Sequence, residues 1–145
     1  MFKVDINRVQ QVLINLIGNA IKFSNRSSNV FINLILDKYM SHLDVNTKIS
    51  IEVADEGIGM AKEDTANLFT PFFKSNSQQS REKNPNGNGL GLSICYKIAK
   101  SLNGDLTCVS TVGLGTIFRF SFMAEKSVEP EKDKKKIKKK NGSSK

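Results

Sequence analysis

Residues 5 to 23 carry apolar side chains at the spacing of an amphipathic helix, and this pattern constrains the fold more than any other. Asp5 precedes the pattern as an N-cap, and the polar stretch 24–28 ends it. An apolar stripe of this kind faces a core. Its members recur every three or four residues and are Val9, Val12, Leu13, Leu16, Ile17, Ala20 and Ile21.

A polar stripe runs along the same helix beside the apolar face. Its members, 3, 4, 4 and 3 residues apart, are Arg8, Gln11, Asn15, Asn19 and Lys22. At about 100° per residue they fall within an arc of about 80°. A solvated face would explain the stripe, but asparagine is a poor helix former and two asparagines lie one turn apart here. A carboxamide oxygen suits Mg²⁺, and Lys22 would bring an ammonium group to the same anion.

Two glycine clusters follow, DEGIGM at residues 55–60 and GNGLGL at 87–92. The first is too short for a dinucleotide fingerprint, and the second lacks the Lys-Ser/Thr that completes a P-loop. Asp55 stands at a predicted strand end, where a carboxylate can accept a hydrogen bond from an adenine amino group. The second cluster leads into a helix, so its backbone N–H groups would point at an anion such as a polyphosphate.

The remaining patterns predict an α+β fold. Strands are expected at 29–37, 48–54, 105–110 and 116–123, with a hairpin loop at 38–47 and a tight turn at 111–115. Helical segments are expected at 62–68 and 92–102, the latter closed by Gly104. The order helix, hairpin, loop, helix, hairpin predicts a two-layer sandwich, with helices on one face of a mixed, mostly antiparallel sheet.

Residues 74–88 show no periodicity and are rich in Ser, Asn, Gln and Gly. A long structureless loop within a compact domain is usually functional or disordered. We expect it to form a lid, with Lys74 and Arg81 as mobile cations over a bound anion. A disordered surface loop is the alternative, and for Arg81 the sequence leaves the choice open.

Composition favours one domain, since 145 residues supply a single core. Nine Lys and three acidic residues lie in 126–145, so 9 − 3 = +6 of the net charge of +8 is there and 8 − 6 = +2 is left for residues 1–125. We therefore expect a domain at 1–125 and a disordered Lys-rich tail or linker at 126–145. A weak contact of the tail with nucleic acid or anionic lipid is the less favoured reading, because aromatic residues are not interleaved with the lysines.

The same composition bears on the environment of the chain. Cys95 and Cys108 sit in apolar patterns without metal or redox spacing, which indicates reduced core residues. A membrane span and a secretory h-region are not evident in the sequence. We expect a soluble cytoplasmic fragment without a membrane contact of its own or a specific nucleic-acid partner, although a longer parent protein could be membrane-anchored.

The motifs together resemble the ATP-binding domains of sensor histidine kinases, within the GHKL superfamily. VQQVLINLIGNAIKFS is similar to the N box, DEGIGM to the first glycine box, LFTPFF to the phenylalanine box and GNGLGLSI to the second glycine box. GLGTIFRFSF is similar to the closing hairpin of these domains. The matches cover about residues 5–123 in the expected order.

The resemblance implies the Bergerat fold and Mg²⁺-ATP as the ligand. It implies that Asn19 ligates Mg²⁺, that Asn15 supports the phosphate and metal region, and that Lys22 and Arg81 are candidate phosphate contacts. Asp55 would bind the adenine amino group and share a water with Thr116. The other implied residues shape the turn at the base, anchor the lid or close it over the triphosphate: Gly57, Gly59, Met60, Phe69, Pro71, Phe73, Lys74, Gly87, Gly89, Leu90, Gly91 and Leu92.

The resemblance also implies transfer of the γ-phosphoryl group to a histidine on a separate dimerisation domain, with a response regulator downstream. Superfamily members that hydrolyse ATP carry a glutamate base where this helix has Asn15, and an amide cannot take a proton from water. His42, the only histidine, lies in the predicted hairpin loop and is expected to be exposed and unphosphorylated. An ATP-binding pseudokinase or scaffold is the alternative function, and an ATPase is the least favoured.

Overall fold

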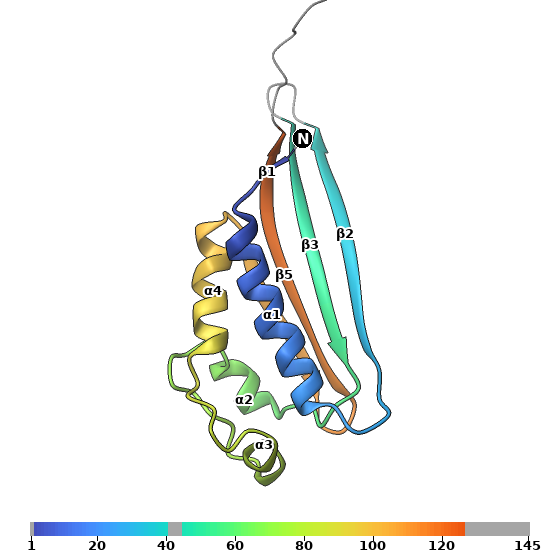
Figure 1. The fold of residues 1–145 in the computed structure, drawn as a ribbon, viewed down its shortest axis with the longest axis vertical. Helices are drawn as coiled ribbons and strands as arrows, with labels where there is room; N and C mark the ends of the chain where they lie inside the picture. Colours follow the sequence, from blue (N-terminus) through green and yellow to red (C-terminus); the bar gives the residue numbers. More distant parts are fainter. Residues whose placement is uncertain (1, 41–44, 127–145) are drawn as a thin grey trace, which may run out of the picture.

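The structure is a computed structural model that describes residues 2–40 and 45–126, in which five strands and four helices form an α+β fold (Figure 1). Their order along the chain is β1 (Phe2–Lys3), α1 (Ile6–Phe23), β2 (Val30–Met40), β3 (Val45–Asp55), α2 (Lys62–Asn67), α3 (Gln78–Lys83), α4 (Gly91–Ser101), β4 (Asp105–Thr111) and β5 (Gly115–Lys126). The predicted N-cap is confirmed, because the Asp5 side chain accepts a hydrogen bond from the backbone N–H of Arg8 at 3.2 Å.

The sheet has the strand order β1-β5-β3-β2. Strand β4 also pairs with β5, along the same edge as β1 but with a different part of the strand. Every pairing within the described residues is antiparallel, so the parallel pairs expected of a mixed sheet are not found there. Hairpins connect β2 to β3 and β4 to β5, and short hairpin connections of this kind produce antiparallel neighbours.

Helices α1, α2 and α4 cover one face of the sheet and form the second layer of the sandwich, whereas α3 lies beyond the end of the sheet and contacts α1 (Figure 1). Side chains along β5 alternate: Phe120 is fully buried, whereas its neighbour Arg119 lies on the other face and pairs with Glu52 at 2.5 Å. The core joins the inner face of the strands to the apolar faces of α1 and α4. Its buried members include Val9, Val12, Leu16, Ala20, Val53, Cys95, Ile98, Ala99, Leu106, Phe118, Phe120 and Phe122.

Two sequence-based expectations about loops need correction. The hairpin loop predicted at 38–47 is shorter, because β2 continues to Met40 and β3 begins at Val45, which leaves only 41–44 between them. The segment 74–88 is not structureless, because residues 78–83 form α3. The Ser77 side chain caps α3 by accepting from the backbone N–H of Ser80 at 3.2 Å. None of the residues of this short helix is buried, so its sequence has no apolar periodicity from which a helix could be predicted.

Other sequence-based expectations concern His42, the Lys-rich tail, the two cysteines and a membrane span. His42 and residues 127–145 of the predicted tail lie outside the described residues, whereas Lys126 is the last residue of β5. Both cysteines are free, and burial raises the pKa of Cys95 to about 11 and that of Cys108 to about 12. Among the described residues, none of the helices is both long and apolar enough to cross a bilayer.

Candidate functional site

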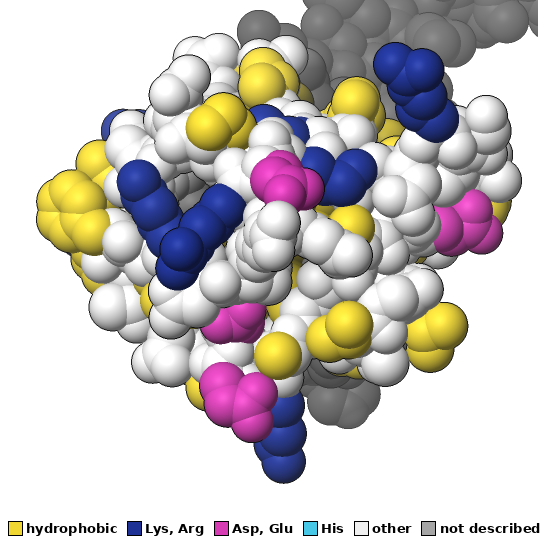
Figure 2. Space-filling view, turned by 90° about the horizontal axis from the view of Figure 1, so that it is seen from below, with side chains coloured by type: hydrophobic (Ala, Val, Ile, Leu, Met, Phe, Trp, Pro, Cys, Tyr) yellow, Lys and Arg dark blue, Asp and Glu magenta, His cyan; other side chains and the backbone are white. Residues whose placement is uncertain are grey.

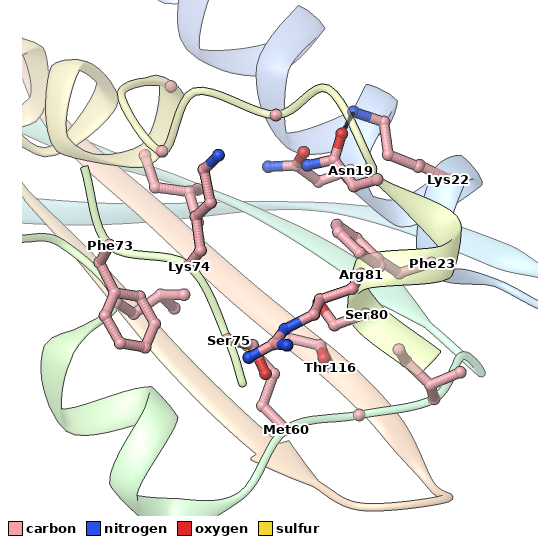
Figure 3. Close-up of a pocket in the computed structure, with 18 of the residues that line it drawn as sticks. Asn19, Lys22, Phe23, Met60, Phe73, Lys74, Ser75, Ser80, Arg81 and Thr116 are labelled. Carbon is pink, nitrogen blue, oxygen red and sulfur yellow. Dashed lines mark hydrogen bonds between the residues drawn. The ribbon is translucent and has the colours of Figure 1, made fainter. Parts of the chain in front are cut away.

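A cavity of about 740 Å³ opens between α1, the ends of β3 and β5, and the segment that runs from Phe73 to Leu92. Figure 3 shows side chains from α1, from α3 and from the loops around it pointing toward this space. Most of the predicted site residues line it: Asn15, Asn19, Lys22, Asp55, Gly59, Met60, Phe73, Lys74, Arg81, Gly87, Gly89, Gly91, Leu92 and Thr116. Its size is in the range of sites that hold a small organic ligand.

Asp55 and Thr116 form one end of the cavity. They face each other in the register of β3 and β5, and they are only 8% and 6% exposed. The Asp55 carboxylate accepts a hydrogen bond from the backbone N–H of Gly57 at 2.9 Å. Burial raises the pKa of Asp55, and this effect outweighs the opposing hydrogen bonds from the backbone of Gly57 and Thr116. A buried carboxylate with unused acceptor capacity is therefore available to a ligand.

The turn that follows Asp55 is held from two sides. The backbone N–H of Ile58 donates to the carbonyl of Phe23 at 3.2 Å, and the carbonyl of Ile58 accepts from Gly113 at 2.8 Å. Gly59 has a φ of +63°, and a Cβ there would lie 1.9 Å from the carbonyl oxygen of Thr111. Only glycine fits this position, since a side chain would clash with the neighbouring backbone. The turn is thus tied to both α1 and the β4–β5 hairpin.

The two asparagines of α1 contact each other in the wall of the cavity that α1 forms. The Asn19 side-chain NH₂ donates to the Asn15 carbonyl Oδ1 at 3.2 Å, and both residues are half-buried. Within the described residues, Oδ1 of Asn19 has no hydrogen-bond partner, so it is free to ligate a cation. Gly91 packs against this pair, because a Cβ there would lie 2.4 Å from Nδ2 of Asn15.

Three cationic side chains, Lys22, Lys74 and Arg81, line the cavity, and two lysines also connect α1 to the α3 segment. Lys22 donates to Oδ1 of Asn84 at 3.2 Å, and Lys83 donates to the carbonyl of Ser24 at 2.6 Å. Arg81 lines the cavity and donates to Oδ1 of Asn76 at 2.9 Å. On the end of the molecule that includes α3, side chains of both charges are interspersed (Figure 2), so the cations act locally and not as one uniform patch.

Four predicted site residues do not line the cavity: Gly57, Phe69, Pro71 and Leu90. Gly57 lies behind it, where its N–H supports Asp55 and a Cβ would lie 2.5 Å from the carbonyl oxygen of Phe23. Phe69 is partly buried, packs against the core and stacks on Tyr96 with ring centroids 5.2 Å apart. Leu90 precedes α4 and donates its N–H to Oδ1 of Asn88 at 3.2 Å.

Sequence reasoning missed several residues that the fold brings to the cavity. Phe23, Ile58, Leu68 and Phe118 supply apolar walls, and their residue types alone did not distinguish them from the core. The segment that contains α3 supplies further lining residues, the polar Ser75, Asn76, Ser80, Asn84 and Asn88 and the apolar Pro85. The helix formers QQSREK after Ser77 were the signal that could have placed some of them.

Comparison with known proteins adds to this geometry. A family model described as "Histidine kinase-, DNA gyrase B-, and HSP90-like ATPase" matches residues 4–126. The chain belongs to this ATPase family. Its sequence is 34% identical over 116 residues to the peroxide stress-activated histidine kinase mak2 of Schizosaccharomyces pombe, a match that covers 80% of this chain and 5% of mak2. It is 33% identical over 124 residues to the autoinducer 2 sensor kinase/phosphatase LuxQ of Vibrio cholerae, covering 86% of this chain and 14% of LuxQ.

Two solved structures share the fold of this ATPase-family domain. Full-length ShkA, in complex with AMPPNP, superimposes with a TM-score of 0.62 and 25% identity, covering 83% of this chain and 22% of ShkA. The catalytic domain of the histidine kinase ThkA gives a TM-score of 0.56 and 28% identity, covering 83% of this chain and 69% of that one. The domain therefore has the fold of a histidine-kinase catalytic domain and corresponds to a small part of its full-length relatives.

Gly91→Ala should displace the Asn15–Asn19 amide pair without unfolding the domain. The new Cβ would overlap the flexible Asn15 side chain, whereas alanine in place of glycine favours a helix by up to about 1 kcal/mol. Side-chain amide resonances of Asn15 and Asn19 in NMR spectra should shift, with thermal stability retained. Gly18→Ala, in α1 with no atom near the new Cβ, is the control and should leave both resonances in place. Unmoved resonances in the Gly91 variant would contradict the packing described for it.

Asp55→Asn should stabilise the folded domain more at neutral pH than at acidic pH. Because its pKa is raised in the folded state, ionised Asp55 costs stability at every pH above that raised pKa, and the cost disappears below the ordinary pKa of an aspartate. Asparagine avoids the cost and keeps an oxygen for the Gly57 N–H. Urea unfolding of both proteins between neutral and acidic pH should show their stability difference shrinking as the pH falls. A difference that stays constant with pH would refute the burial penalty.

Proposed function

We propose that this domain binds Mg²⁺-ATP in the cavity and donates the γ-phosphoryl group to a histidine on a separate dimerisation domain. One observation carries the proposal: a buried carboxylate, Asp55, and a pair of carboxamides, Asn15 and Asn19, occupy one cavity in a chain of this ATPase family. ShkA, which shares the fold, was solved in complex with AMPPNP.

The Asp55 end of the cavity suits the adenine base. A flat ring can approach the turn because Gly59 lines the cavity without a side chain, while Met60 and Phe118 supply apolar surface. The Asp55 carboxylate has acceptor capacity left after binding the Gly57 N–H, and the adenine amino group is a donor that matches it. This end would orient the nucleotide with its phosphates toward α1.

The asparagine end suits the triphosphate and a magnesium ion. The described residues contain no group of three or more His, Cys, Asp or Glu side chains that could hold a metal ion. A cation at this site would therefore take its oxygen ligands from Asn19 and the nucleotide. The free Oδ1 of Asn19 fits that role, because Mg²⁺ usually takes few protein ligands together with phosphate oxygens and waters. Bound there, the ion would neutralise charge on the phosphates. Lys22, Lys74 and Arg81 would add charge around the same group.

Hydrolysis of ATP by this domain is less well supported than transfer. Asp55 is the one carboxylate among the described residues that line the cavity, and it comes from the end of β3, whereas the asparagines belong to α1. A general base must be within hydrogen-bond reach of the attacking water, and the amides of Asn15 and Asn19 cannot accept its proton. The domain would therefore hold ATP until an acceptor side chain is brought to it.

The acceptor and downstream partners are inferred from the relatives. Two similar proteins of Dictyostelium discoideum have the name hybrid signal transduction histidine kinase. We propose that a histidine-bearing dimerisation domain is the first partner, supplied in cis or in trans, and that a response regulator receives the phosphate afterwards. We infer a cytoplasmic location, because Cys95 and Cys108 are both free thiols and a reducing compartment keeps thiols in that form.

Incubation with γ-labelled ATP, Mg²⁺ and a dimeric domain that bears the acceptor histidine tests the proposal directly. We expect acid-labile label on the partner and none when its histidine is replaced by alanine. Binding of ATP without transfer would instead indicate a pseudokinase or scaffold. Steady release of labelled phosphate without the partner would indicate an ATPase.

Asn19→Ala should lower the affinity for ATP at least about tenfold in the presence of Mg²⁺ and much less in EDTA, because the variant lacks the proposed ligand oxygen. Isothermal titration calorimetry in both conditions provides the measurement. Asn7→Ala is the matched control, since Asn7 is an exposed asparagine on the same helix and does not line the cavity. Equal Mg²⁺-dependent affinities of the Asn19 variant and the parent would remove the metal assignment.

A further inference from the structure

Ser110 lies directly behind the Asp55 end of the cavity, although it does not line it. The strand register places Ser110 opposite Thr116, and Thr116 opposite Asp55, so the three residues form a row across β4, β5 and β3. Side chains opposite each other in a sheet share a face, and here that face is the one covered by helices. Ser110 is thus the neighbour of the two residues that face the nucleotide base in the proposed function.

The Ser110 hydroxyl makes three hydrogen bonds. It accepts from the backbone N–H of Met60 at 2.8 Å, donates to the carbonyl of Gly115 at 3.0 Å, and lies 2.8 Å from the hydroxyl oxygen of Thr116. A serine hydroxyl has one proton and two acceptor sites. Since that proton goes to Gly115, all three bonds form together only when Thr116 donates its own proton to Ser110.

This arrangement fixes the hydrogen-bonding character of Thr116. With its proton directed at Ser110, the Thr116 oxygen has only lone pairs left for the cavity that it lines. The Asp55 carboxylate beside it is also an acceptor. A base with an amino group at this edge, or a water that donates to both oxygens, satisfies the pair. A base with an oxo group would bring a further acceptor against them and leave buried groups unpaired.

We propose that Ser110 is a positioning residue for base selection, which orients the Thr116 hydroxyl so that Asp55 and Thr116 together favour a 6-amino purine over a 6-oxo purine. The inference rests on the proposed function, namely that adenine binds at this end of the cavity. It assigns selectivity to a residue that would not touch the nucleotide.

Binding of Mg²⁺-ATP and Mg²⁺-inosine triphosphate to the whole chain tests the inference, because inosine carries an oxo group in place of the amino group. Ser110→Ala should lower the preference for ATP over inosine triphosphate about tenfold, the worth of one hydrogen bond, since Thr116 is then free to donate. Ser110→Thr retains the hydroxyl and should restore the preference. If Ser110→Ala weakens the binding of both nucleotides equally, Ser110 only supports the turn and the inference is overturned.

A double-mutant cycle shows whether Ser110 acts through Thr116. In a Thr116→Val background, Ser110→Ala should cause no further change in the nucleotide preference, because the hydroxyl that it orients is absent. A further change of similar size would overturn the inference. Ser110→Cys gives the same readout should the alanine variant fail to fold. If the parent chain binds no ATP, the proposed function fails too, whereas ATP binding with an unaltered preference in the variants refutes the role of Ser110 alone.

Discussion

The packing of α1 against the sheet determines where the polar groups of the cavity lie. Val12 and Leu16 are fully buried in the core that also contains Val53 and Phe120. Each such side chain stabilises the fold by about 1.5–3 kcal/mol through removal of its surface from water. Because the helical period fixes the angle between the apolar and polar faces, this burial also directs the asparagines of α1 toward the cavity.

The base end of the cavity depends on strand register. Asp55, Thr116 and Ser110 come from three strands and lie side by side because each pair is directly opposite in the antiparallel ladder. A slip of one residue would turn every side chain of a strand to the other face, and burial of the apolar side chains of β5 resists such a slip. The same apolar alternation that builds the core therefore aligns the hydroxyls with the carboxylate.

The α3 segment is held by a different kind of interaction. None of its helical residues is buried, and it contacts α1 through hydrogen bonds from Lys22 and Lys83. Surface hydrogen bonds of this kind contribute little compared with core packing, so the segment is anchored more weakly than the helices of the core. This division suits a proposed lid, since Asp55 and the asparagines are held by the core and need not move with it.

The sequence by itself determined the elements whose residues repeat. The apolar period of α1 predicted the helix and the polar stripe beside it, strand-forming residues predicted β3 and β5, and the glycine clusters marked the turns beside the cavity. Only the tertiary structure decided what such local patterns do not encode. It made α3 a helix, stacked Phe69 on Tyr96 outside the cavity lining, and brought Ser110 within 2.8 Å of Thr116. These outcomes depend on contacts between residues distant in sequence, or on single hydrogen bonds that do not repeat along the chain. Neither can be predicted from the residue pattern of one strand or helix.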